Sequence, residues 1–183
     1  MATAMAPSSR ATGSTGVPVF YDIEASGLDG FPIEVGWAWA DAASGSIISE
    51  AHLIRPPSDW DVRGSWDPAA AARHRIGIDD LFRHGRSPFE IAQRINGSVH
   101  GRELFADSPF DERWLTLLFD AAGLEPEFRV RRTDPQVLIA ALAGDRTRYA
   151  AAKREAARIA PTTHRAEADA RHWAVLWAMI ALG

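Results

Sequence analysis

Acidic residues in three separate segments of this chain have spacings that could support metal-dependent chemistry. Asp22 and Glu24 lie two residues apart at the end of a short apolar segment. Asp111 lies in the middle of the chain, and Asp169 follows His164 by five residues near its end. Carboxylate oxygens are hard ligands that suit Mg²⁺ or Mn²⁺ far better than zinc. Gathered in one place, these side chains could form a metal site with a histidine beside it.

The first pair, Asp22 and Glu24, is expected at the end of a strand over residues 17–23. Residues two apart in a strand project from the same face. Two carboxylates side by side at the end of a buried strand would repel each other strongly without a cation. The pair could also mark the solvent-exposed end of a strand, because an isolated Asp-x-Glu pattern is common. The later acidic segments favour the metal site.

Asp111 is expected in the first turn of a helix that follows a short strand over residues 102–106. The junction between a strand end and a helix start is a common ligand site in α/β folds. Asp107 lies just ahead of Pro109, and we predict that it caps this helix. Asp107 could instead add another carboxylate to the site.

His164 and Asp169 are expected at the start of a helix over residues 164–182, capped by Thr162 or Thr163. Two side chains five residues apart do not share one face of a helix. His164 would therefore reach the site from the loop, as suits a general base, while Asp169 lies about one turn inside. Other histidines and charged residues are predicted to be exposed, capping or solvated: His52, His74, His84, His100, His172, Arg165 and Glu167.

The elements that must position these residues are strands first and mostly helices afterwards. Apolar segments over residues 17–23, 33–40 and 47–54 have short connections and predict an antiparallel meander. Further strands are predicted over residues 102–106 and 127–131. Helices are predicted over about 67–73, 78–82, from 87 onward, 109–122, 135–143, 148–159 and 164–182. This order predicts an α/β fold with a mixed five-stranded sheet, three antiparallel strands then two parallel, flanked by helices.

The composition limits the class of protein. Residues 1–16 are rich in Ala, Ser, Thr, Gly and Pro and are predicted to be a disordered tail, which leaves residues 17–183 as a single domain. No apolar run approaches the roughly 20 residues that cross a bilayer, which argues against a membrane protein. A dinucleotide-binding fold is rejected, because an acidic pair replaces the glycine-rich turn after the first strand.

Charge and cysteine content bear on the site. The chain has no cysteine, which excludes thiolate ligands and disulfides and fits a cytoplasmic location. Its net charge of −4 is unusual for a nucleic-acid-binding protein. Two divalent cations would cancel the negative charges of four carboxylates. The other 20 of the 24 acidic residues would then balance the 20 Lys and Arg. The modest acidity therefore does not exclude a nuclease.

In sequence order, residues 21–27 (YDIEASG), 105–111 (FADSPFD) and 164–169 (HRAEAD) resemble the three sequence blocks of the DEDDh family of 3′→5′ exonucleases. Residues 33–36 (IEVG) also look like the family's second strand. The resemblance covers nearly the whole chain from Val17 onward. It implies a ribonuclease H-like fold and an exonuclease domain.

The activity implied by the resemblance is release of nucleoside 5′-monophosphates from the 3′ end of single-stranded DNA or RNA. Two Mg²⁺ or Mn²⁺ ions would be held by four carboxylates beside one histidine: Asp22, Glu24, Asp111, Asp169 and His164. Asp22 would bridge the ions, and Glu24 and Asp169 would complete the shell of one of them. Asp111 would contribute to the other ion, and His164 would deprotonate or orient the attacking water.

The family pattern also implies how the terminal nucleotide is held. Backbone groups and an apolar side chain just after the first block would contact it: Ala25, Ser26, Gly27 and Leu28. Trp66, with Arg63 and His74 nearby, could form one wall of the groove, or it could be a core anchor. Two positions depart from the pattern, since Ser26 replaces a usual Thr and Asp107 a frequent Asn.

Alternatives stay open. The same motif serves DNA and RNA, so the protein could be an RNA-specific trimmer or a degrader of short oligoribonucleotides. The protein could also be a catalytically silent ribonuclease H-like module that only binds nucleic acid or a partner protein. Such a module would be expected to have lost an acidic position, and none is lost here. A homodimer is also open, because the tryptophan-rich segments could be buried or form a dimer face.

Overall fold

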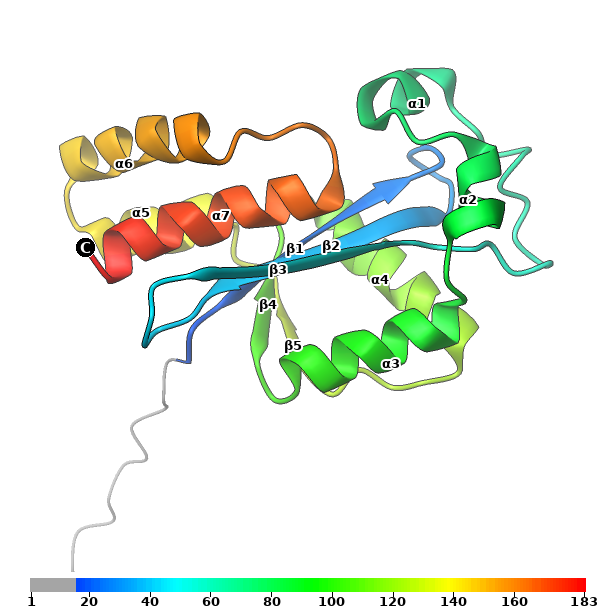
Figure 1. The fold of residues 1–183 in the computed structure, drawn as a ribbon, viewed down its shortest axis with the longest axis horizontal. Helices are drawn as coiled ribbons and strands as arrows, with labels where there is room; N and C mark the ends of the chain where they lie inside the picture. Colours follow the sequence, from blue (N-terminus) through cyan, green and yellow to red (C-terminus); the bar gives the residue numbers. More distant parts are fainter. Residues whose placement is uncertain (1–15) are drawn as a thin grey trace, which may run out of the picture.

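The central strand of the sheet, β1 (Val19–Ala25), lies between an antiparallel and a parallel neighbour (Figure 1). On one side it pairs with β2 (Pro32–Ala40), which pairs antiparallel with β3 (Ile47–Leu53). On the other side it pairs with β4 (Glu103–Phe105), which pairs in parallel with β5 (Arg129–Arg131). The strand order β3-β2-β1-β4-β5 confirms the predicted mixed five-stranded sheet.

The computed structural model describes residues 16–183. The predicted tail over residues 1–16 lies outside the described residues, apart from Gly16. Strands β4 and β5 have three residues each, fewer than predicted. Glu127, predicted as a strand residue, instead donates its backbone N–H to the side chain of Asn96.

Every predicted helix is present, with small differences at the ends. Helix α7 begins at Ala166, two residues after the predicted start. Helix α6 begins two residues before its predicted start, because the carboxylate of Asp145 caps it by accepting the N–H of Arg148 at 2.7 Å. The helices are α1 (Pro68–His74), α2 (Ile78–His84), α3 (Pro88–Val99), α4 (Pro109–Ala122), α5 (Pro135–Ala143), α6 (Arg146–Ile159) and α7 (Ala166–Ala181).

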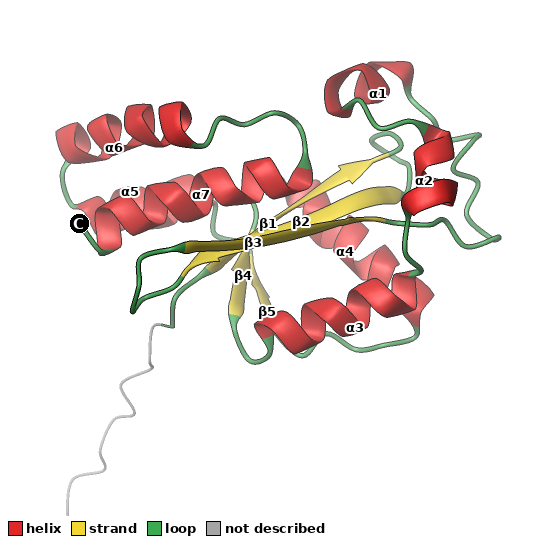
Figure 2. Ribbon diagram, in the orientation of Figure 1, coloured by secondary structure: helices red, strands yellow, loops and turns green. Residues whose placement is uncertain are grey.

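Helices cover both faces of the sheet, with α5, α6 and α7 on one face and α3 and α4 on the other (Figure 2). Alternation along β1 divides the core between these layers. Tyr21 and Ile23 pack with α3 and α4, whereas Phe20 packs with α5, α6 and α7. Asp22 and Glu24 alternate with Tyr21 and Ile23, so they share the face of Phe20 and project towards α7.

Helices α1 and α2 lie beyond the carboxyl end of β1 (Figure 1), where α2 and the segments on either side of α1 form a small third core with β2. This core contains Ile33 of β2 together with Val62, Ile76 and Leu81. It anchors the segments that flank α1 to β2. No helix among the described residues is both long and apolar enough to cross a membrane.

The tryptophans mostly fill the cores. Trp37 and Trp114 are buried between the sheet and the helices α3 and α4. Trp173 and Trp177 are partly buried and pack against the core beneath α7. The homodimer stays a prediction.

Candidate active site

Two groups of three carboxylates meet at β1, and they share Asp22. In the first group, Asp22, Glu24 and Asp169 bring oxygens within 4.8 Å of one another. In the second group, Asp22, Asp107 and Asp111 meet the same limit. The structure therefore brings together the four carboxylates singled out in the sequence, from β1, α4 and α7, and adds Asp107 to them.

The first turn of α7 can approach the sheet because of Gly36, which pairs with Asp22 across β1 and β2. A Cβ atom at Gly36 would overlap with the carbonyl carbon of Ala166 and lie 2.5 Å from the backbone nitrogen of Glu167. Only glycine leaves this space free. The contact carries Asp169, in the same part of α7, to the side of Asp22.

Asp169 lies about one turn inside α7, as predicted, and its backbone N–H donates to the carbonyl of Arg165 at 3.0 Å. Its carboxylate accepts a hydrogen bond from the backbone N–H of Thr163 at 2.8 Å. The predicted threonine cap is wrong, because Arg165 occupies the N-cap position without a side-chain cap bond. The carboxylate of Asp169 instead ties the preceding loop to the helix.

His164 lies in this loop, where it is exposed and lines the same cavity as the carboxylates. Its backbone is left-handed, with φ of 55°, a conformation that few residues other than glycine adopt. The predicted position in the loop before the helix is confirmed. An exposed imidazole at the rim can exchange protons with solvent while it faces the cavity.

Helix α4 supplies Asp111, which is only 1% exposed although it carries a carboxyl group. The cap of this helix is Ser108, whose hydroxyl accepts the N–H of Phe110 at 3.2 Å, so the prediction that Asp107 is the cap is wrong. Asp107 directs its carboxylate to the cluster and to Trp173, whose indole Nε1–H donates to it at 3.3 Å. Ser108 can cap because it directly precedes Pro109 at the first helical position.

The carboxylates of the cluster are difficult to ionise in the absence of a cation. Burial, followed by the charges of Asp169 and Glu34, raises the pKa of Glu24 to about 7. Burial and the charges of Asp111 and Glu24 hold the pKa of Asp22 well above its ordinary value. Burial and the charge of Asp107 likewise raise the pKa of Asp111. Each additional negative charge here opposes ionisation of the next.

Two oxygens of the cluster, Asp22 Oδ2 and Asp111 Oδ2, are buried without a hydrogen-bond partner among the described residues. A buried carboxylate oxygen without a partner is costly. A divalent cation would satisfy both oxygens and offset the repulsion. Because every donor in the two groups is a carboxylate oxygen, the residues fit Mg²⁺ or Mn²⁺.

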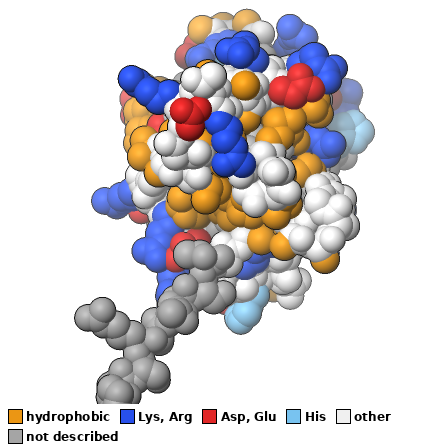
Figure 3. Space-filling view, turned by 90° about the vertical axis from the view of Figure 1, so that its left-hand side faces the viewer, with side chains coloured by type: hydrophobic (Ala, Val, Ile, Leu, Met, Phe, Trp, Pro, Cys, Tyr) orange, Lys and Arg blue, Asp and Glu red, His pale blue; other side chains and the backbone are white. Residues whose placement is uncertain are grey.

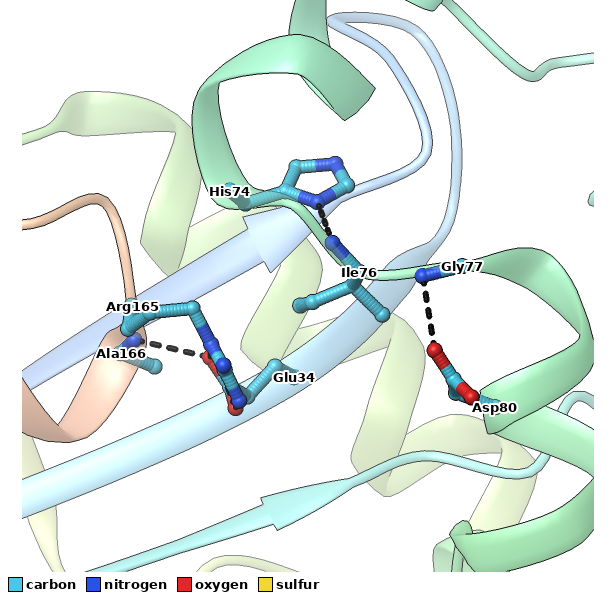
Figure 4. A network of polar contacts seen from close by, with 7 residues as sticks. All are labelled: Glu34, His74, Ile76, Gly77, Asp80, Arg165 and Ala166. Atoms are coloured by element: carbon cyan, nitrogen blue, oxygen red, sulfur yellow. Dashed lines mark hydrogen bonds and ion pairs between the residues drawn. The ribbon is translucent and has the colours of Figure 1, made fainter.

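An ion pair between the buried Glu34 and the half-exposed Arg165 lies next to the cluster, since Glu34 neighbours Glu24 across the sheet (Figure 4 shows the pair). Glu34 of β2 lies opposite Glu24 in the strand register and is 3% exposed. Its carboxylate accepts hydrogen bonds from Arg165 Nε at 3.0 Å and from the backbone N–H of Ala166 at 2.9 Å. Arg165 is exposed, as predicted, but it also pairs with Glu34, a contact that the sequence did not indicate. Glu167 is exposed, as predicted, and accepts the hydroxyl of Ser49 at 2.8 Å.

Two histidines predicted to be exposed or capping are buried. His74 is 2% exposed, and its Nδ1 accepts the backbone N–H of Ile76 at 3.0 Å (Figure 4). His172 is 6% exposed, and its Nδ1 lies 2.8 Å from the carbonyl oxygen of Ala160. Both predictions are wrong: each buried ring contacts the backbone through Nδ1, and Nε2 of His74 has no partner among the described residues. His52 is half-buried beside Glu50, and His84 and His100 are exposed.

A cavity of about 520 Å³ opens over the carboxylates. Of the predicted substrate-binding residues, Ala25, Gly27 and Leu28 line it. Ser26 does not, because it is fully buried and its hydroxyl bonds Ser65 at 2.8 Å. Trp66 packs against the small third core instead, as the core-anchor interpretation expects.

Further residues of the cavity wall were missed by the sequence reasoning. Arg73 of α1 lines the cavity and acts to lower the pKa of Glu24. Phe110, next to Asp111, lines it as well and is 38% exposed. The position of Phe110 directly before Asp111, a candidate metal ligand, could have indicated that it lines the site. No pattern in the sequence marked Arg73, because α1 is far from the acidic segments in the chain.

No family model matches the chain, and no curated protein matches its sequence. Solved structures do share its fold. Exonuclease I of E. coli in complex with a dA16 oligonucleotide superposes with a TM-score of 0.64 and 16% identity over 90% of this chain and 40% of that chain. An apo structure of Exonuclease I gives a TM-score of 0.59 and 14% identity over 91% and 42% of the two chains.

Exonuclease X in complex with 5′ overhanging duplex DNA gives a TM-score of 0.50 and 21% identity over 89% of this chain and 90% of that chain. The present chain therefore spans about 40% of the Exonuclease I chain with dA16 but almost the full length of Exonuclease X. At these identities the likeness shows the fold, which is ribonuclease H-like.

Proposed function

We propose that this chain is a metal-dependent 3′→5′ exonuclease that releases nucleoside 5′-monophosphates from the ends of single-stranded DNA or RNA. The observation that carries the proposal is the pair of three-carboxylate groups that share Asp22, with His164 on the rim of the same cavity. The direction of attack rests on the resemblance of the three acidic segments to the DEDDh exonucleases. The fold shared with Exonuclease I and Exonuclease X, both solved with DNA, supports it.

The first carboxylate group would hold one cation and the second group the other, with Asp22 common to both. When bound, Mg²⁺ or Mn²⁺ supplies positive charge beside the scissile phosphate and lowers the pKa of a water. Burial of Asp111 and the hydrogen bond from Thr163 to Asp169 hold these two carboxylates in place.

His164 would accept the proton of the attacking water. Its ring faces the cavity from a loop, so it can take a proton on one side and release it to solvent. The loop is held at Thr163 by Asp169, which couples the position of the proton acceptor to that of a ligand.

The end of a nucleic-acid strand would bind along the cavity wall. Leu28 and Phe110 line the cavity and expose 58% and 38% of their surface, so each offers an apolar face to a terminal base. Arg73 would contact a phosphate. The end of the molecule that carries α5 and α6 shows Lys and Arg scattered among apolar side chains, with few acidic ones (Figure 3).

The choice between DNA and RNA stays open, and with it the alternatives of an RNA trimmer or a degrader of short oligoribonucleotides. A silent binding module is disfavoured, because all four carboxylates converge and the histidine lines the same cavity. A silent module would gain no stability from Mn²⁺.

The test is to incubate the protein with 5′-labelled single-stranded DNA and RNA of matched sequence, in Mg²⁺, Mn²⁺ or EDTA. We expect a ladder that shortens from the 3′ end only with the cations and that is absent with Asp22→Asn. His164→Asn should slow cleavage by about 10²–10⁴-fold, while His84→Asn, an exposed histidine of α2, should not. No cleavage of either strand in Mn²⁺ would favour the silent module.

A further inference from the structure

We propose that Asp107 is a fifth carboxylate ligand of the metal centre, serving the ion of the second group. The inference rests on the proposed metal-dependent function and concerns a residue at which this chain departs from the family pattern. It predicts a centre with one more negative charge than the four carboxylates implied by the resemblance.

The geometry of the second group carries the proposal. Oxygens of Asp22, Asp107 and Asp111 all lie within 4.8 Å of one another. Ligand oxygens lie about 2.0–2.6 Å from Mg²⁺ or Ca²⁺, so oxygens across one ion are separated by about twice that distance. Small side-chain adjustments therefore suffice for three oxygens to share one cation.

An unsatisfied buried oxygen points independently to a ligand at this place. Asp111 is 1% exposed, and its Oδ2 has no hydrogen-bond partner among the described residues. The neighbouring Oδ2 of Asp22 is buried and unpartnered as well. Another carboxylate beside them adds repulsion unless a cation lies between. A cation shared with Asp107 accounts for both the unpaired oxygens and the third acid.

Apart from one hydrogen bond with Trp173, no contact among the described residues gives Asp107 another role. The cap of α4 is Ser108, and no ion pair of the described residues involves Asp107. The indole N–H of Trp173 donates to it at 3.3 Å, which orients the carboxylate and leaves it acceptor capacity for an ion. Asp107 is also the exposed member of its group, so an ion can enter from its side.

The chemical consequence concerns affinity. An asparagine at this position would offer a neutral oxygen, whereas a carboxylate offers a full negative charge to a hard cation. Asp107→Asn should therefore lower the affinity for the ion of the second group by about tenfold or more. Losses of this size are seen when groups around metal sites are removed. The ion of the first group, which has ligands from Glu24 and Asp169, should be much less affected.

The test is calorimetric titration of Mn²⁺ into metal-free protein, with the free ion followed by its paramagnetic resonance. Asp134→Asn is the matched control. Asp134 also carries a charge that acts on Asp107, but it lies outside both carboxylate groups. Its carboxylate caps α5 by accepting the N–H of Gln136 at 2.6 Å, and asparagine can cap equally well.

The proposal predicts two binding events in the wild type, one of them weakened about tenfold or more by Asp107→Asn, and both nearly unchanged in Asp134→Asn. Asp107→Ala, as a second variant, should show the same selective loss. Equal effects of Asp107→Asn and Asp134→Asn, or equal weakening of both ions, would overturn the assignment and leave the proposed function standing. Absence of Mn²⁺ binding in the wild type would instead remove the proposed function itself.

Discussion

Glu34 on β2 and Arg165 at the start of α7 form an ion pair between residues 131 positions apart, with Arg165 Nε 3.0 Å from Glu34 Oε2. The same carboxylate accepts the backbone N–H of Ala166. Because Glu34 lies opposite Glu24 in the sheet, this pair anchors the helix that bears Asp169 directly beside the first carboxylate group.

Glu34→Gln should therefore lower the free energy of unfolding by about 1–3 kcal/mol, since hydrogen bonds to a charged group are lost at a buried position. Glu167→Gln is the control, because Glu167 is an exposed carboxylate of α7. This substitution should lower the free energy of unfolding by less than about 1 kcal/mol. Urea denaturation in EDTA measures both. Equal stability of the two variants would show that the Glu34–Arg165 pair does not anchor α7.

Gly36→Ala should displace the first turn of α7. The added Cβ would overlap with backbone atoms of Ala166, which cannot move without the helix, and overpacking of this kind costs about 1–3 kcal/mol. Mn²⁺ should also bind more weakly, since Asp169 moves with α7. Gly97→Ala in α3, where a Cβ meets nothing within 4 Å, should instead leave the protein as stable or stabilise it. A Gly36→Ala protein with wild-type stability and Mn²⁺ affinity would contradict the close contact.

The raised pKa of Glu24 makes the stability of the metal-free protein depend on pH. Its pKa rises from 4.5 in the ordinary state to about 7 in the fold, so between these values the folded protein holds a proton that the unfolded chain has released. This contribution is complete below the lower value and is lost as pH rises through the higher one. The slope is at most about 1.4 kcal/mol per pH unit.

Glu24→Gln should flatten this part of the stability curve, whereas Glu167→Gln should leave it unchanged. Urea denaturation in EDTA across the same pH window measures the effect. A wild-type curve that rises with pH through this window would mean that Glu24 is not held in a protonated form by burial and its acidic neighbours.

Asp22→Asn should change stability in opposite directions with and without metal. In EDTA the variant should be more stable than the wild type, because it no longer buries a carboxyl group that its acidic neighbours repel. In Mn²⁺ it should lose the stabilisation that the wild type gains, about 2.7 kcal/mol when the ion is at 100 times its dissociation constant. Thermal melting in both buffers measures the crossover. The same order of stabilities in both buffers would contradict a metal role for Asp22.

Much of this arrangement could be predicted because it depends on local patterns. The alternation of Trp37 and its neighbours predicts a strand, and the two-residue spacing of Asp22 and Glu24 places both on one face. The convergence of Asp111 and Asp169 on that face followed from the resemblance of the acidic segments.

The failures concern contacts between distant segments. Nothing near Arg165 in the sequence indicates that Glu34 lies beneath it. The positions of Ser26 and Trp66 are likewise set by distant contacts, since Ser26 bonds Ser65 and Trp66 packs against the third core. Asp107 and Ser108 both suit a helix cap, and only the approach of Trp173 from α7 separates their roles.

The most direct test of the central claim is to hydrolyse a single-stranded oligonucleotide in ¹⁸O-labelled water and to identify the first product by mass spectrometry. The proposed function predicts a nucleoside 5′-monophosphate from the 3′ end that carries ¹⁸O, formed with Mg²⁺ or Mn²⁺ and not formed by Asp22→Asn. A nucleoside 3′-phosphate, internal fragments, or product formation in EDTA would contradict it.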